Sequence, residues 1–143
     1  MTIVLNNQQD LFVDKYRNIC LWESGKYVDN IFLKKRRSGR TEAILYLLRE
    51  IFTVHQFNII YFTHSETFFS RIQQYFSNEI VKIDKNEHCT NLALCNGSSI
   101  ILPKNEETNI YIYQNQENIL IVFDGIDENL INPNLTNCIK LIV

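Results

Sequence analysis

Apolar residues near the start of the chain recur at the spacing of an amphipathic helix. Asn6 and Asn7 suit a helix N-cap, because a short polar side chain can accept a backbone N–H of the first turn. The apolar positions that follow, three or four residues apart, are Leu11, Phe12, Tyr16 and Ile19. This pattern predicts a helix. Gly25 marks the end of the short segment that follows this helix.

Two strand–helix units are predicted next. Residues 28–33 form a short β-branched and aromatic run, which indicates a strand, and a strongly helical stretch follows over 41–54. Residues 57–63 are a continuous apolar run, which is typical of a buried parallel strand. Helical spacing returns over residues 64–77.

The second half of the chain is richer in strand signals. Residues 91–102 predict a hairpin, because Asn96-Gly97 lies between two apolar runs and a type I′ turn needs positive φ at both central positions. Residues 110–113 offer another short strand. Apolar runs at 119–123 and 138–143 predict two more strands, and a polar connector with Pro133 joins them.

Alternation of strands and helices at these spacings predicts a three-layer α/β domain with a mostly parallel central sheet. Residues 31–33, 59–62, 119–123 and 139–142 should be neighbouring strands, with helices on both faces. In such sheets the ligand site lies at the carboxyl ends of the strands.

Length and composition fit one folded domain over residues 1–143. Hydrophobic residues make up 45% of the chain and charged residues 21%, which excludes the low-hydrophobicity class of disordered proteins. No run approaches the roughly 18 to 20 apolar residues that span a bilayer, and the N-terminus lacks a basic-then-apolar leader. We therefore expect a soluble intracellular protein without membrane partners.

The four cysteines are scattered without a CxxC pair, so neither a disulfide framework nor a zinc site is indicated. His88 and Cys89 lie near Cys95, but the sequence offers no fourth ligand beside them. We expect these three to be loop and core residues, and we expect the cysteines of the chain to be reduced.

A basic segment stands out against the net charge of −2. Residues 34–41 read KKRRSGRT and lie between a predicted strand and a predicted helix, where a phosphate-binding loop belongs. Such loops bind phosphates through backbone N–H groups and a helix N-terminus, and Gly39 and Thr41 suit close backbone approach and Mg²⁺ ligation. The alternative interpretation is a solvated basic turn or a nuclear-localisation-like patch.

A second candidate element is the buried strand that ends at Asp124. A carboxylate at this place can hold Mg²⁺ through water, as in the Walker B motif. A strand-ending aspartate is also a routine cap of a following loop. The preceding phosphate-loop candidate favours the first interpretation, because the two elements occur in the order of a P-loop ATPase.

Together these features resemble the ATPase domain of terminase large subunits, the DNA-packaging motors of herpesviruses and tailed phages, over nearly the whole chain. In that family paired arginines introduce the phosphate loop, which lacks the first glycine, as in Arg36-Arg37-Ser38-Gly39-Arg40-Thr41 here. The family also has a strand ending in a pair such as Thr63-His64, and a hairpin bearing Asn-Gly-Ser before the Walker B strand, similar to 96–98.

The resemblance implies a P-loop fold that binds ATP and Mg²⁺. The residues it assigns to the nucleotide are Arg36, Arg37, Ser38, Gly39, Arg40, Thr41 and an adenine-contacting glutamine, Gln9 or Gln8. It assigns the metal to Thr41 and Asp124, and catalysis to Arg40, Asp124 and Glu128. The implied partners are double-stranded DNA, the portal and the remaining terminase chains, in the host nucleus for a herpesvirus-like protein.

Three departures from the family pattern bear on activity. Arg40 replaces the loop lysine, and its planar fork is bulkier than an ammonium. Gly125 stands where the catalytic glutamate is expected, and Asp127 or Glu128 would have to reach back from the following turn. We also expect the chain to lack the coupling motif and the nuclease domain, and so to be unable to cut DNA by that route.

Several functions remain open from the sequence. The first is an ATPase-like module of a packaging motor, and the second is a non-hydrolysing nucleotide- or DNA-binding or scaffold protein on the same fold. A helicase-like P-loop ATPase and an unrelated α/β protein are further alternatives.

Overall fold

The fold was obtained as a computed structural model, which describes residues 4–32, 38–104, 118–126 and 138–143. The helices are α1 (Asn7–Tyr16), the short 3₁₀ helix η1 (Ile19–Leu21), α2 (Arg40–Val54) and α3 (Phe68–Tyr75). The strands are β1 (Gly25–Val28), β2 (Asn58–Thr63), β3 (Ile80–Lys85), β4 (Cys89–Leu94), β5 (Ser99–Pro103), β6 (Ile119–Asp124) and β7 (Ile139–Ile142).

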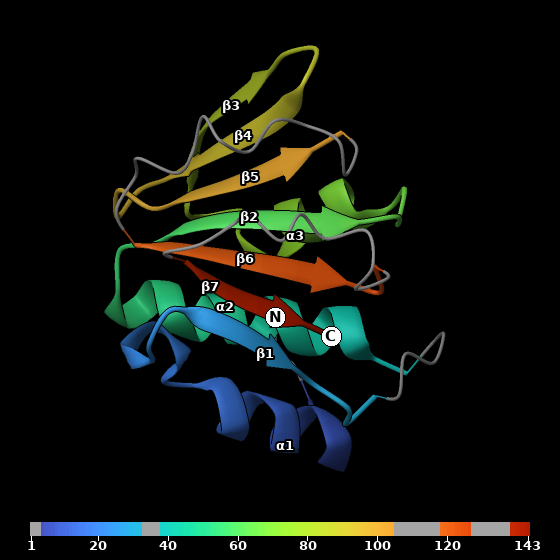
Figure 1. The fold of residues 1–143 in the computed structure, drawn as a ribbon. Helices are drawn as coiled ribbons and strands as arrows, with labels where there is room; N and C mark the ends of the chain where they lie inside the picture. Colours follow the sequence, from blue (N-terminus) through green and yellow to red (C-terminus); the bar gives the residue numbers. More distant parts are fainter. Residues whose placement is uncertain (1–3, 33–37, 105–117, 127–137) are drawn as a thin grey trace.

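Within the described part, the strands form one mostly parallel sheet in the order β1-β7-β6-β2-β5-β4-β3 (Figure 1). The first five of these run parallel, whereas β4 and β3 continue from β5 as an antiparallel meander. The sequence prediction of an α/β fold with a mostly parallel sheet, and of β2, β6 and β7 as neighbours, is confirmed. β7 separates β1 from β6.

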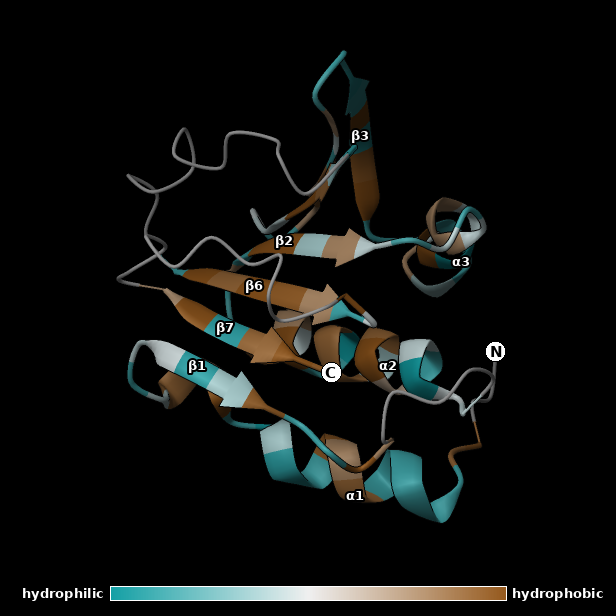
Figure 2. Ribbon diagram, turned by 45° about the vertical axis from the view of Figure 1, so that its right-hand side comes forward, coloured by the Kyte–Doolittle hydropathy of each residue, from teal (hydrophilic) through white to brown (hydrophobic). Residues whose placement is uncertain are grey.

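Side-chain alternation divides the sheet into two buried faces. On β6, Leu120 and Val122 belong to the larger core cluster, which also contains the inward side chains of α1, α2 and α3. The opposite face carries a second buried cluster, with Ile121 and Phe123 from β6. Figure 2 shows the hydrophobic residues concentrated along β6, β7 and α2. The described helices thus form one outer layer, and a helical layer on the other face stays a prediction.

The first helix begins where the sequence placed it. Asn6 is the N-cap, and it forms a capping box with Gln9 in which each side chain accepts the other's backbone N–H. The buried stripe is Gln9, Phe12, Val13 and Tyr16. Leu11, which we had counted with the apolar positions, is exposed, and Ile19 is buried after the helix in η1.

The first strand differs from the prediction of 28–33. β1 ends at Val28 because its register partner on β7, Ile142, is the last residue of that strand. Asp29 then donates its N–H to the Ile142 carbonyl (2.7 Å) and accepts the Ile31 N–H on its carboxylate (2.9 Å), which turns the chain away. Phe32 is buried in the core without being in a strand, and residue 33 lies outside the described residues.

Other boundaries were also wrong. The helix predicted over 64–77 begins only at Phe68, because Ser65 uses its N–H to bond the Thr63 hydroxyl and forms a local turn (3.1 Å). β3 was missed, although Ile80, Val81 and Ile83 are β-branched, because its apolar run is short and the strand lies largely exposed at the edge of the sheet. The hairpin of β4 and β5 is confirmed, but only Gly97 of its central pair has positive φ (+89°), so the turn is not type I′.

Two further predictions, the strand at 110–113 and the connector with Pro133, fall outside the described residues. Among the helices that the structure describes, none combines the length and apolar character needed to cross a bilayer.

Candidate phosphate-binding site

The centre of the candidate site is Asp124, the last residue of β6. Alternation along the strand puts its side chain on the same face as Leu120 and Val122, which is the face covered by the helices. Its residue exposure is 3%, so its charge is almost fully removed from water. A buried carboxylate requires donors, because burying an unpaired charge is costly.

Three side chains supply those donors. Arg40 Nε donates to Asp124 Oδ1 at 2.7 Å, and the Thr41 hydroxyl donates to Oδ2 at 2.8 Å. The Tyr61 hydroxyl also donates to Oδ2, at 2.6 Å. Thr41 and Asp124, to which the resemblance assigns one metal ion, are therefore joined by a direct hydrogen bond, and their role as metal ligands stays a prediction.

Sequence reasoning missed Tyr61. It lies on β2, whose Thr63 is in register with Asp124, and alternation from Thr63 turns Tyr61 towards the helices. An aromatic residue inside an apolar run is typical of plain core, so only the pairing of β2 with β6 could have identified it. Its ring stacks on Phe68, with centroids 4.0 Å apart.

The Tyr61 hydroxyl is held in its protonated form. Burial raises the pKa of Tyr61 well above its usual value of 10.0, and the neighbouring Asp124 charge and hydrogen bond raise it further. The phenol is therefore a permanent donor to the carboxylate at neutral pH.

The N-terminus of α2 opens directly onto Asp124. Gly39 is the N-cap, with φ +79° in the left-handed region that glycine adopts without strain. Its carbonyl accepts the Ala43 N–H (3.0 Å), and no side chain caps this helix end. The first-turn N–H groups of a helix carry a partial positive charge that favours anions.

Gln9 reaches the same helix end from α1. Its side-chain amide donates to the Gly39 carbonyl (2.9 Å) and accepts the Asn6 N–H (2.8 Å), and the residue is buried. A Cβ on Gly39 would meet this amide and would be strained at the positive φ, so both features favour glycine there. Gln9 therefore lies beside Gly39 with its amide engaged by the protein, and its contact with adenine stays a prediction.

Arg40 extends over Gly125. The glycine has φ +71°, and a Cβ built on it would lie 2.5 Å from Arg40 Nη2. The Arg40 side chain is 18% exposed, so most of the guanidinium is enclosed between α2 and the end of β6.

The structure describes only some of the other residues that the sequence assigned to the site. Ser38 is described and partly buried beside Gly39. Lys34, Lys35, Arg36, Arg37, Asp127 and Glu128 lie outside the described residues, so their roles stay predictions.

A magnesium ion is implied by the resemblance, and the donor types suit it, since Thr41 and Asp124 offer hard oxygen ligands. The arrangement does not fit. Both carboxylate oxygens already accept bonds from Arg40, Thr41 and Tyr61, and the guanidinium neutralises the charge. Across residues 4–32, 38–104, 118–126 and 138–143, no three His, Cys, Asp or Glu side chains form a potential metal group.

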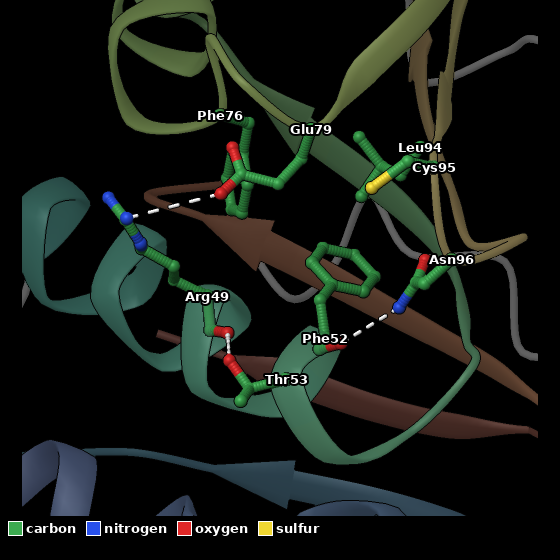
Figure 3. A pocket seen from close by; sticks show the side chains of 8 residues that line it. All are labelled: Arg49, Phe52, Thr53, Phe76, Glu79, Leu94, Cys95 and Asn96. Carbon is green, nitrogen blue, oxygen red and sulfur yellow. Dashed lines mark hydrogen bonds and ion pairs between the residues drawn. The ribbon is translucent and has the colours of Figure 1, made fainter.

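A separate cavity of about 190 Å³ lies at the other end of α2 (Figure 3). Phe52 and Phe76 form its apolar wall, and Arg49 faces Glu79 across it at 4.0 Å. Phe52 is twelve residues beyond Arg40, roughly 18 Å along the helix. The cavity is therefore not part of the Asp124 site.

The turn of the β4–β5 hairpin, residues 95–98, packs at this far end. Asn96 donates to the Phe52 carbonyl (2.8 Å) and so satisfies a carbonyl of the last turn of α2, and Ser98 Oγ accepts the Phe57 N–H (3.0 Å). The Asn-Gly-Ser segment thus caps a helix and does not lie at the candidate site.

Comparison with known proteins found no matching family model, no matching curated protein and no matching solved structure.

Proposed function

We propose that this chain is a nucleotide-binding module of the terminase ATPase type, which binds nucleotide phosphates at residues 34–41 and hydrolyses ATP slowly or not at all. The observation that carries the proposal is the meeting of Arg40 and Thr41, the first two residues of α2, on the Asp124 carboxylate. A basic residue, a hydroxyl and a strand-ending carboxylate at a helix N-terminus are the parts from which P-loop sites are built.

The position of these residues in the fold also supports the proposal. They gather at the carboxyl ends of parallel strands, where α/β sheets bind ligands. The left-handed Gly39 begins α2, whose first-turn N–H groups favour anions, and the basic residues of 34–41 would add charge that attracts phosphate. A P-loop class for the sheet is part of the same proposal.

Slow hydrolysis follows from two of the departures from the family pattern, Gly125 and Arg40. Gly125 offers no carboxylate to activate a water, and Arg40 occupies Asp124. Loss of one transition-state-stabilising group typically costs roughly 10²-fold to 10³-fold in rate. Binding is less affected, because the helix N–H groups and the other basic side chains are unchanged and Arg40 keeps the positive charge of the lysine it replaces.

The second candidate is a working ATPase, for which Arg40 would have to leave Asp124 so that Thr41 and Asp124 could hold Mg²⁺ and Glu128 could activate water. The Thr41–Asp124 hydrogen bond favours it, since it puts both proposed ligands together. In either case the resemblance implies packaging-motor subunits and double-stranded DNA as partners, in the host nucleus for a herpesvirus-like source.

The test is to measure ATP affinity and turnover for the unaltered chain and for Arg40→Lys combined with Gly125→Glu. The two changes belong together, because a side chain at 125 would collide with Arg40. We expect the unaltered chain to bind ATP with turnover far below an ordinary enzyme rate of roughly 1 s⁻¹. Turnover at that rate or faster would favour the second candidate.

A matched pair on α2 tests the place of binding. Thr41→Val should weaken ATP binding, because it removes a hydroxyl at the proposed phosphate site. Thr53→Val should not, since the Thr53 hydroxyl bonds the Arg49 carbonyl (2.9 Å) near the other end of the same helix. Absence of ATP binding to the unaltered chain would refute the proposed function.

A further inference from the structure

The Asp124 carboxylate is paired with a cation of the same chain, the Arg40 guanidinium. Arg40 Nε lies 2.7 Å from Oδ1, and the two side chains are 18% and 1% exposed. A charge-assisted bond in such a poorly solvated place is strong, and removal of either partner would leave the other charge uncompensated. The pair is therefore a stable part of the fold.

The second carboxylate oxygen is also occupied from within the chain. Thr41 and Tyr61 both donate to Oδ2, at 2.8 and 2.6 Å. A metal ion on Oδ2 would have to displace a buried phenol or hydroxyl, and one on Oδ1 would stand beside the positive charge of Arg40, which repels it. Oδ2 thus has both of its acceptor positions filled by protein donors, and Oδ1 already accepts a bond from a cation.

The hydrogen bond from Arg40 to Asp124 uses Nε and neither of the two Nη groups. An arginine has five N–H donors, and the bond to Asp124 uses the one on Nε. Nη2 lies over Gly125, where a Cβ would stand 2.5 Å away. Glycine at 125 therefore makes room for this orientation, and the two departures, Arg40 and Gly125, form one arrangement.

We propose that Arg40 acts in this chain as the counter-cation of Asp124 and presents its Nη donors to phosphate, so that nucleotide phosphates bind without a divalent cation. The inference rests on the proposed function. Because Nε remains on Asp124, Arg40 can hold the carboxylate and a phosphate oxygen together, which a divalent cation would otherwise do.

The test measures the affinity of the unaltered chain for ATP in Mg²⁺ and in EDTA, at equal ionic strength. We expect the two dissociation constants to agree within about threefold, less than 1 kcal/mol in binding free energy. Binding that weakens more than about tenfold in EDTA would overturn the inference while leaving the proposed function standing. Absence of binding in both solutions would overturn both.

Two variants separate the roles of the ion pair. Asp124→Asn should bind ATP in EDTA at least as tightly as the unaltered chain, because the Arg40 charge is no longer compensated. A loss of affinity in Asp124→Asn that occurs only with Mg²⁺ would identify Asp124 as a metal ligand and contradict the inference. Arg40→Lys should make binding depend on Mg²⁺, and thermal melting should establish that both variants fold.

Discussion

The Arg40 guanidinium fills the space in which a side chain of residue 125 would stand, with Nη2 2.5 Å from the ideal Cβ position on Gly125. The same guanidinium holds Asp124, the preceding residue, through its Nε. Residues 40 and 125 are therefore sterically coupled. A change at one of them has consequences that depend on the other.

Substitution Gly125→Ala tests this coupling. A new Cβ would stand against the guanidinium that holds Asp124, and φ +71° strains any L side chain. We expect a loss of about 1–3 kcal/mol in the free energy of unfolding, measured with urea. In an Arg40→Ala background only the backbone strain should remain, about 1–2 kcal/mol. An equal cost in both backgrounds would contradict the steric coupling.

The hydrogen bond from Tyr61 to Asp124 should contribute to stability. Tyr61→Phe removes a buried donor to a charged acceptor, and we expect a loss of about 1.5–3 kcal/mol in urea unfolding. Tyr27→Phe is the matched control, because the Tyr27 hydroxyl bonds the Glu23 carbonyl at an exposed place (2.6 Å). The control should cost clearly less, and similar losses would argue against a special role for Tyr61.

Alkaline pH should destabilise the fold through two tyrosines. Burial raises the pKa of Tyr16 above its usual 10.0, with its bond to Asp29 adding to the shift, and burial and Asp124 do the same for Tyr61. The folded state then binds more protons than the unfolded state above pH 10, so this stability is fully present below about pH 10 and is lost as pH rises through the folded pKa. Unfolding free energies measured across this range should fall less steeply in the double variant Tyr16→Phe, Tyr61→Phe.

The Asn96 amide should stabilise α2 without affecting the affinity for nucleotide. Asn96→Ala removes the donor to the Phe52 carbonyl at the end of the helix, with an expected cost of about 1 kcal/mol. ATP affinity, measured by calorimetric titration, should not change, because the candidate site lies at the start of α2. A large drop in affinity would mean that the hairpin turn belongs to the binding site.

Thiol reactivity should be confined to Cys95. It is exposed, whereas Cys89 and Cys138 are buried, and burial raises the pKa of Cys20 to about 12. A thiolate is the reactive form, so a thiol-specific reagent near neutral pH should label Cys95 rapidly and the others slowly. Replacement Cys95→Ser should abolish the fast phase, and a remaining fast phase would show that another cysteine is accessible.

The sequence alone determined the elements whose signals are local. A continuous apolar run predicted β6 and its end at Asp124, and helical spacing predicted α2 within one residue of its observed start. Asn6 was identified as a cap because the capping residue bonds a neighbour three positions away. These features depend on periodicity and short-range bonds, which the order of residues encodes directly.

Only the tertiary structure decided what meets Asp124. The alignment of Thr63 with Asp124 across β2 and β6 brings Tyr61 to the carboxylate, and no spacing along the chain records that register. The end of β1 at Val28 and the position of Arg40 over Gly125 likewise depend on partners more than 80 residues away. Local patterns determine helices and strands because the bonds within these elements are short-range. The partners of a charged side chain instead depend on strand order and burial, which follow from the packing of the whole sheet.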